Sequence, residues 1–171
     1  EHETTRVLLL SNSQSKTQET NLIYYQIKKE LEEKKKEDQT VNISEYSIDS
    51  SSDFDTEEFV RDIFVSGEDI PDVLVCMDEV VTECVYQALI DYNQVGNVDI
   101  VGFYYSDVIL DAISKGIISS AIALDMDETG RYSINALEEF SSLGHTSNYY
   151  SVGQHVITRS NVGIYRTEGD K

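Results

Sequence analysis

Cysteines, basic residues and long apolar runs are scarce in this sequence, and each scarcity argues against a class of protein. Its cysteines, Cys76 and Cys84, form no CxxC pair and have no histidine nearby, so buried free thiols are expected rather than a disulfide or a metal site. The 13 basic residues face 32 acidic ones, and the net charge of −19 argues against nucleic acid and anionic membrane as direct partners. No apolar run approaches the roughly 20 residues of a membrane span, and no signal-peptide pattern opens the sequence.

Motifs for nucleotide and hydrolase chemistry are also missing. The polar loop after the first apolar run, Ser11–Ser15, holds no glycine and is therefore neither a GxGxxG turn nor a P-loop. There is no GxSxG motif, and the histidines are isolated. Asp125, Asp127 and Glu128 gather at a strand-to-helix junction, where a helix N-terminus is a commoner explanation than a cation site. Because no nucleophile, base and orienting group come together, the chain is expected to be no enzyme and to need no cofactor.

Residues 72–106 carry the most regular pattern of the chain. A short apolar run at 72–76 is followed by apolar residues at spacings of three and four over 79–92, and then by a second apolar run at 98–103. This strand–helix–strand order predicts a βαβ unit and a parallel sheet. Ligands of such sheets bind at the carboxyl ends of the strands, which here are Met77–Asp78 and Tyr104–Tyr105.

Strands and helices alternate along the rest of the sequence. Strands are expected at 6–10, 40–48, 72–76, 98–103, 117–124 and 149–158, and helices at 17–36, 55–64, 79–92, 106–115 and 128–143. This order predicts an α/β fold, a doubly wound, mainly parallel sheet flanked by helices.

Several helix ends can be predicted from single residues. Asp55 or Thr56 is expected to cap the second helix, Ser106 the fourth and Asp127 the fifth, and Gly116 is expected to end the fourth. The fifth helix is expected to turn three apolar residues toward the core, Ile134, Leu137 and Phe140.

The stretches PDVLVCMDEVVTECVYQALIDY and VDIVGFYYSDVILDAISKGIISSAIALDMDETGRYSINALEEF resemble the periplasmic binding protein family of the ribose-binding and LacI type. The resemblance lies in an acidic residue that opens a helix after a strand, a Val-Gly-Phe strand end, a Lys-Gly helix end and a glycine near the start of the last helix, namely Asp78, Val101–Phe103, Lys115–Gly116 and Gly130. The closing His155–Val162 is similar to the family's last strand. Members have two α/β lobes around a cleft, and this chain resembles the C-terminal lobe together with the segments that recross. The resemblance implies that residues 1–165 are one lobe, that residues 166–171 are a tail and that an N-terminal lobe is missing.

The resemblance also implies where a ligand would bind. The family's polar residue before the acidic one is Met77 here, its acidic residue after Val-Gly-Phe is Tyr104, and a basic residue of its first helix falls at Asn21. Asp78 matches the family, as a ligand contact or as a helix cap. Sugar hydroxyls need dense polar pairing, so the Met77 and Tyr104 replacements favour a less polar ligand, an aromatic stacking contact or no small ligand at all. The partner that the resemblance implies is a small molecule, a sugar or a less polar analogue. The candidate ligand-binding residues are Ser11, Asn12, Asn21, Met77, Asp78, Tyr104, Tyr105 and Asp125.

The function that the resemblance implies is a solute-binding or sensory module, which closes on a small molecule and relays that closure to a membrane transporter or a sensor kinase. Such a module is extracytoplasmic. One alternative is the effector-binding domain of a LacI-type repressor, which is cytoplasmic and a homodimer. Another is a flavodoxin-like electron carrier, because the Ser/Thr-rich loop after the first strand resembles a flavodoxin phosphate loop that contains glycine.

Overall fold

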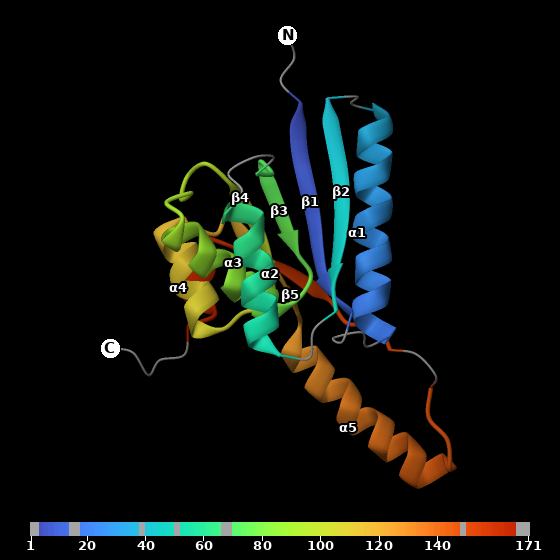
Figure 1. Cartoon of the computed structure of the whole chain (residues 1–171). Coiled ribbons are helices and arrows are strands. Elements are labelled where there is room, and N and C mark those ends of the chain that lie inside the picture. The colour runs from blue at the N-terminus through green and yellow to red at the C-terminus, as the bar shows by residue number, and fades with distance from the viewer. Residues whose placement is uncertain are drawn as a thin grey trace.

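A six-stranded sheet with helices on both faces organises the chain (Figure 1). The computed structural model describes residues 4–13, 18–37, 40–49, 52–65, 70–147 and 150–166. The strands are β1 (Thr5–Asn12), β2 (Val41–Ile48), β3 (Val73–Cys76), β4 (Asp99–Phe103), β5 (Ser120–Leu124) and β6 (Gln154–Thr158). The helices are α1 (Gln18–Glu37), α2 (Asp53–Val65), α3 (Glu79–Asp91), α4 (Asp107–Lys115) and α5 (Met126–Leu143), followed by a 3-10 turn at Val162–Ile164.

The strand order is β2-β1-β3-β4-β5-β6, in which β1 to β5 are parallel and β6 runs antiparallel to β5. The predicted α/β class with a mainly parallel sheet is therefore confirmed. β2 lies at one edge of the sheet, which agrees with the alternation of its wet and partly buried residues. The interior strand β1 is buried on both sides, since Leu9 faces one layer of helices and Leu10 the other.

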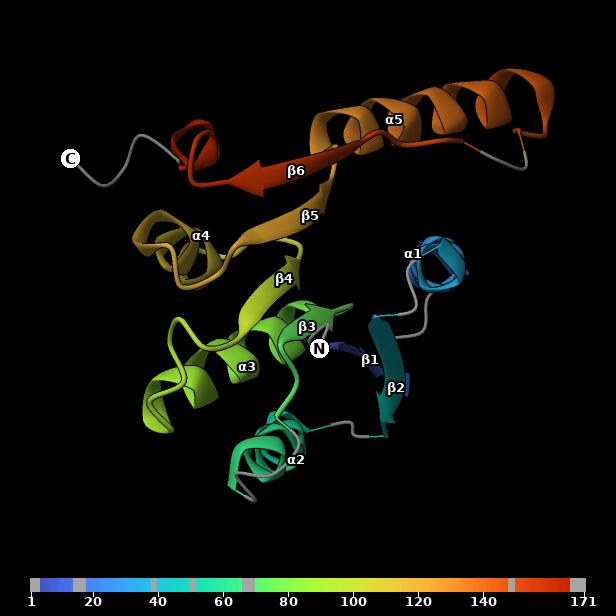
Figure 2. The ribbon, with the colours of Figure 1, turned by 90° about the horizontal axis from the view of Figure 1, so that it is seen from above.

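Two apolar clusters hold the layers together. The larger one joins α2, α3 and α4 to one face of the sheet and includes Val60, Leu89 and Ile109. The smaller one joins α1 to the other face through Ile23 and Leu9. Figure 2 shows this arrangement, with α2, α3 and α4 on one side of the strands and α1 on the other.

Several predicted helix ends are confirmed. Ser106 caps α4 through its hydroxyl, which accepts a hydrogen bond from the Ile109 amide at 3.3 Å. Gly116 ends the same helix with a φ of +74°, a left-handed conformation that glycine adopts without a steric penalty. α2 begins earlier than predicted, at Asp53, because the Ser52 hydroxyl accepts from the Asp55 amide and opens the helix before Asp55 or Thr56.

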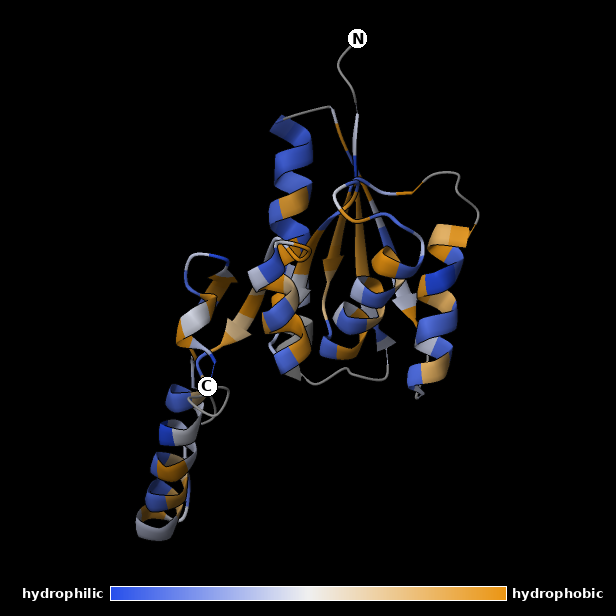
Figure 3. Cartoon of the chain, turned by 90° about the vertical axis from the view of Figure 1, so that its left-hand side faces the viewer, coloured by the Kyte–Doolittle hydropathy of each residue, from blue (hydrophilic) through white to orange (hydrophobic). Residues whose placement is uncertain are grey.

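The fifth helix differs from the sequence prediction in its cap and in its surroundings. Asp125, not Asp127, caps α5, because the Asp125 side chain accepts from the Glu128 amide at 2.8 Å. Ile134, Leu137 and Phe140 do not face a core, since α5 has no buried residue. The helix leaves the sheet and extends away from it (Figure 3). The returning segment contacts Tyr132 and Glu139, but Ile134, Leu137 and Phe140 stay largely exposed in the described part of the chain. Helical periodicity predicts an apolar face but not the partner of that face.

Two strands, β1 and β6, also have bounds that differ from the sequence prediction. β1 runs on through Ser11 and Asn12, which pair with Ser47 and Ile48 of β2, so these two residues end a strand rather than open a loop. The last strand is shorter than predicted and begins at Gln154. The closing segment of the chain is anchored by Val162, which is buried in the larger cluster.

Apolar residues of β4 and β5 lie at the margin of the smaller cluster, on the sheet face that also carries α1. Phe103, Ile122 and Val156 stand in one row across β4, β5 and β6, and Val101 and Leu124 flank them on the same side. Of these, Val156 is exposed and the others are half-buried. Val101, Phe103 and Leu124 pack against the smaller cluster, while Val156 and the apolar residues of α5 stay exposed in the described part of the chain.

Candidate functional site

The carboxyl ends of the parallel strands meet at one edge of the sheet. Asn12 ends β1, Met77–Asp78 follows β3, Tyr104 follows β4 and Asp125 follows β5. Neighbouring strands are in register along this edge, with Leu10 of β1 opposite Cys76 of β3 and Phe103 of β4 opposite Ile122 of β5. Ligands of open α/β sheets bind at such edges, so this edge is the candidate functional site.

The β1 end contributes polar side chains. Ser11 and Asn12 are half-buried at the end of the strand. Asn21 belongs to α1, but its side chain lies outside the described part of the chain.

At the β3 end, two adjacent residues have different surroundings. The Met77 side chain is only 1% exposed and packs against Ile23 and Val75 in the cluster beneath α1. Asp78 is half-buried, and its Oδ1 accepts a hydrogen bond from the Val81 amide at 3.2 Å, which caps α3. The predicted cap at Asp78 is thereby confirmed, while contacts of Met77 and Asp78 with a ligand stay predictions.

Thr82 ties the β3 end to the β4 end. Its hydroxyl donates to the Asp78 carbonyl at 2.7 Å and accepts from the Phe103 amide at 3.1 Å. The β3–β4 pairing ends at Val75 and Val101, so the Phe103 amide lies beyond the last strand partner and the Thr82 hydroxyl takes that place. Because Thr82 is fully buried, this bridge fixes the relative position of two strand ends that carry the candidate site.

Tyr104 has a strained backbone directly after β4. Its φ is +66°, a left-handed value that costs a non-glycine residue about 1–3 kcal/mol. The ring stacks on that of Tyr105, with centroids 5.2 Å apart and an interplanar angle of 15°. The Tyr104 hydroxyl lies 3.2 Å from the sulfur of Met126, the first residue of α5. These contacts hold a tyrosine ring between the end of β4 and the start of α5.

Aromatic and acidic groups surround this ring. Tyr105 also contacts Tyr165 of the closing segment, with ring centroids 5.6 Å apart. The pKa of Tyr104 is raised, first by burial and then by the nearby Tyr105 and Glu79. Burial also raises the pKa of Glu79, with further increases from Glu83 and Asp78. The edge is therefore aromatic and rich in negative charge.

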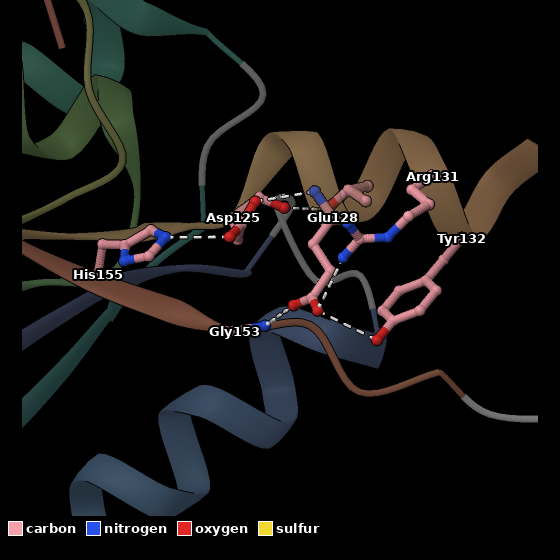
Figure 4. Close-up of polar contacts among 7 residues, drawn as sticks. Asp125, Glu128, Arg131, Tyr132, Gly153 and His155 are labelled. Atoms are coloured by element: carbon pink, nitrogen blue, oxygen red, sulfur yellow. Dashed lines mark hydrogen bonds and ion pairs between the residues drawn. The ribbon is translucent and has the colours of Figure 1, made fainter. Parts of the chain in front are cut away.

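A polar cluster joins β5, α5 and β6 (Figure 4). His155 Nε2 lies 3.1 Å from Asp125 Oδ2, and the Gly153 amide donates to Glu128 Oε2 at 2.7 Å. The other Glu128 oxygen accepts from the Tyr132 hydroxyl at 3.1 Å and from Arg131 at 3.2 Å. The pKa of Asp125 is lowered, first by the Glu128 amide and then by His155. These contacts tie the segment that leaves β5 to the segment that returns to β6.

Neither a metal site nor a membrane span is present in the part of the chain that the structure describes. No three His, Cys, Asp or Glu side chains gather to hold a metal ion there. Both cysteines are buried free thiols, as predicted. No described helix is both long enough and apolar enough to cross a bilayer.

Sequence reasoning missed the roles of Thr82 and Glu128. Thr82 had a usable signal, because it is a hydroxyl residue beside the apolar stripe of α3, next to Val81 and near Val85. A polar side chain at such a position is buried and therefore needs partners. Glu128 had no such signal, since its main partner, Gly153, is 25 residues away.

Comparison with known proteins places the fold. No family model matches the chain, and no curated protein matches it in sequence. Among solved structures, a Caulobacter myo-inositol binding protein bound to myo-inositol has a TM-score of 0.78 at 16% identity, over 94% of this chain and 54% of that one. An ABC transporter solute-binding protein from Agrobacterium vitis, bound with alpha-D-tagatopyranose, has a TM-score of 0.74 at 15% identity, over 93% and 51%. A XylFII–LytSN complex has a TM-score of 0.69 at 19% identity, over 92% and 54%.

The chain thus has the α/β fold of one lobe of a periplasmic binding protein, and the resemblance seen in the sequence is confirmed at the level of the fold. It spans about half the length of the solved structures that it matches.

Proposed function

We propose that this chain is one lobe of a solute-binding module of the periplasmic binding protein type, which holds a small molecule between itself and a second lobe. The observation that carries this proposal is the sheet edge at which Asn12, Asp78, Tyr104 and Asp125 follow neighbouring parallel strands. Residues 1–165 form the lobe in this proposal.

The unpartnered apolar surfaces support a second lobe. On α5, Leu137 is 66% exposed and Phe140 is 62% exposed, and Ile134 and Leu143 are exposed on the same helix. A row of this kind on a projecting helix is typical of a surface that another folded unit covers. The two-lobed structures that the chain resembles have about twice its length, so a lobe preceding this one is the proposed partner of α5.

The chemistry of the edge favours a sugar or a less polar analogue as the ligand. Tyr104 offers a ring for stacking, Asn12 and Ser11 offer amide and hydroxyl groups, and Asp125 offers a carboxylate. Met77 adds apolar packing beneath the site, and Tyr105 supports the Tyr104 ring. Asn21 and Asp78 complete the proposed set, and sugar-binding and inositol-binding proteins have this fold.

Closure of the two lobes on the ligand is the proposed signal. The proposed recipient is a membrane transporter or a sensor kinase, which places the module outside the cytoplasm. Solved relatives in fold include ABC transporter solute-binding proteins and XylFII in complex with LytSN. No catalytic step is proposed for this module.

A thermal-shift screen tests the proposal. The compounds are D-tagatose, D-allose, myo-inositol, adenosine and leucine, each at about 10 mM. A single lobe binds weakly because half of its cleft is absent, so a Kd on the order of 1 mM is expected for the best compound. Such binding adds about 1.4 kcal/mol and raises Tm by roughly 3 °C.

Two tyrosine variants make the screen specific. Tyr104→Ala removes the ring and the hydroxyl at the sheet edge and should abolish the rise in Tm. Tyr25→Ala removes an exposed tyrosine of α1 and should preserve it. Equal rises in Tm for both variants would place the binding elsewhere and refute the proposed site.

A further inference from the structure

A groove runs between α2 and α3, on the face of the sheet opposite α1. It has a volume of about 190 Å³. Its lining includes Cys84 and Ala88 from α3, Tyr92 at the C-cap of α3, and Phe54 from α2. Cys84 and Ala88 are buried at its base, and Tyr92 is anchored there by stacking on Phe64, with ring centroids 6.3 Å apart. The groove thus has a fixed and largely apolar floor.

The rim of the groove is negatively charged. Glu57 and Glu58 line it from α2, and Asp91 lines it from α3. The one cation in the lining, Arg61, lies 3.3 Å from Glu58 and is paired with it. Asp91 accepts a hydrogen bond only from the neutral amide of Gln87 among the described residues. Glu57 forms no ion pair with any residue that the structure describes, so the charges of Glu57 and Asp91 remain uncompensated.

The thiol of Cys84 lies at the base of the groove, and its pKa is influenced by the acidic side chains nearby. Its pKa is raised to about 12, first by burial and then by the negative charges of Glu57, Asp53, Glu83 and Asp78. The thiol therefore stays protonated at neutral pH and adds no charge of its own to the groove.

Phe54 adds a recognition element to this charge. Its ring is 71% exposed at the groove, which is unusual for a phenylalanine in a folded chain. A cation over an aromatic ring gains about 0.5–1 kcal/mol at an exposed site. The planar guanidinium of arginine can stack on such a ring and also donate two parallel hydrogen bonds to a carboxylate. Lysine offers a point charge without this flat surface.

The size of the groove argues for a side chain rather than a free ligand. Sites for small molecules usually enclose about 300–1,000 Å³, and this groove is smaller. An exposed aromatic ring beside a well-packed pocket is typical of protein interfaces, where aromatic and arginine residues pair at the centre.

We propose that the α2–α3 groove is a docking surface for a partner protein that inserts one arginine side chain, with its guanidinium on Phe54 and between the carboxylates of Glu57 and Asp91. The charge complementarity of an uncompensated acidic rim identifies a basic segment of the partner as the occupant. This surface lies on the helices that pack against the sheet face and does not share residues with the proposed ligand site.

NMR titration of the isotope-labelled chain tests the proposal with two matched probes. They are the capped peptides Gly-Leu-Arg-Leu-Gly and Gly-Leu-Lys-Leu-Gly. The arginine peptide is expected to shift amide signals of α2 and α3 around Phe54, Glu57 and Asp91, and to bind more tightly than the lysine peptide. Shifts spread over the whole acidic surface, or equal binding of both peptides, would overturn the proposal.

Charge-matched variants separate the groove from the general negative charge. Glu57→Gln with Asp91→Asn should weaken binding of the arginine peptide about five-fold, as expected for the loss of two exposed charge contacts. Glu32→Gln with Glu138→Gln changes the net charge equally on α1 and α5 and should leave the affinity unchanged. Equal weakening by both pairs would refute the groove as the site.

Two further arms exclude simpler explanations. Phe54→Ala should reduce the preference for arginine over lysine while leaving the fold intact, since Phe54 is mostly exposed. Spermidine should shift the groove signals less than the arginine peptide. Spermidine binding that is tighter than peptide binding would make the groove a small-cation site and overturn the docking surface. Ligand binding at Tyr104 has no bearing on any of these results.

Discussion

The Thr82 bridge should be necessary for the stability of the chain and for the placement of the candidate site. Thr82→Val replaces the hydroxyl with a methyl group of similar volume. The Asp78 carbonyl keeps a second partner, the Thr82 amide at 3.0 Å, but the Phe103 amide loses the hydroxyl that it donates to. A buried donor without a partner costs about 1–3 kcal/mol, so we expect a loss of about 2 kcal/mol in the free energy of unfolding.

Urea unfolding followed by circular dichroism measures this loss. For a small domain with an m value of about 2 kcal/mol/M, the midpoint should fall by about 1 M urea. Thr82→Ser keeps the hydroxyl and should lose less. An unchanged midpoint for Thr82→Val would refute the argument that this hydroxyl replaces a strand partner for Phe103.

Gly102 provides a second test of the close packing around Thr82. A Cβ at Gly102 would stand 2.6 Å from the Thr82 methyl carbon, and Gly102 has no positive φ that would add strain of its own. Gly102→Ala should therefore cost about 1–3 kcal/mol through overpacking. In a Thr82→Ser background the clashing methyl is gone, so the same change should cost less. Equal costs in both backgrounds would show that the close approach of Gly102 and Thr82 does not limit this position.

Three other outcomes follow from the structure. Asp72 accepts hydrogen bonds from the Arg6 amide at 2.7 Å and from the Arg6 guanidinium, and these lower the Asp72 pKa. The ionised Asp72 therefore stabilises the fold above the unfolded pKa of about 3.9, and this stabilisation is lost as the pH falls through the lower folded pKa. Asp72→Asn should make the free energy of unfolding, measured with urea, depend less on pH between about pH 5 and pH 2, and an unchanged pH dependence would contradict this. Phe140→Ser should leave the free energy of unfolding, measured with urea, within about 0.5 kcal/mol of the parent value, because the ring is exposed. A larger loss would mean that α5 packs on the sheet. Burial raises the pKa of both cysteines to about 12, so a thiol reagent at neutral pH should react with the native chain far more slowly than with the chain in urea; fast native labelling would contradict their burial.

Much of the fold could be predicted from local sequence. The helix ends at Asp78, Ser106 and Gly116 depend on contacts within a few residues, so local sequence patterns are enough to predict them. The strands were also predictable, since runs such as Leu8–Leu10 are apolar on both faces. The α5 cap was placed two residues late because Asp125 and Asp127 have the same chemistry, and only backbone geometry distinguishes them.

The parts that sequence could not predict depend on contacts between distant residues. The exposure of Leu137 and Phe140 follows from the direction in which α5 leaves β5, which helical periodicity does not determine. The hydrogen bond from the Gly153 amide to the Glu128 carboxylate joins two segments that are 25 residues apart in sequence. For the candidate site, sequence identified the strand ends at Asp78 and Tyr104, but the positive φ of Tyr104 and its contact with Met126 appear only in three dimensions.

A small molecule is proposed to bind at the carboxyl edge of the sheet, and this chain is proposed to supply only one side of the site. An NMR titration of the labelled chain with the best compound of the thermal-shift screen tests this proposal most directly. We expect fast-exchange shifts centred on Asn12, Asp78, Tyr104 and Asp125, with a Kd on the order of millimolar. Shifts centred away from these strand ends, or a Kd of about a micromolar or tighter for the chain alone, would contradict it.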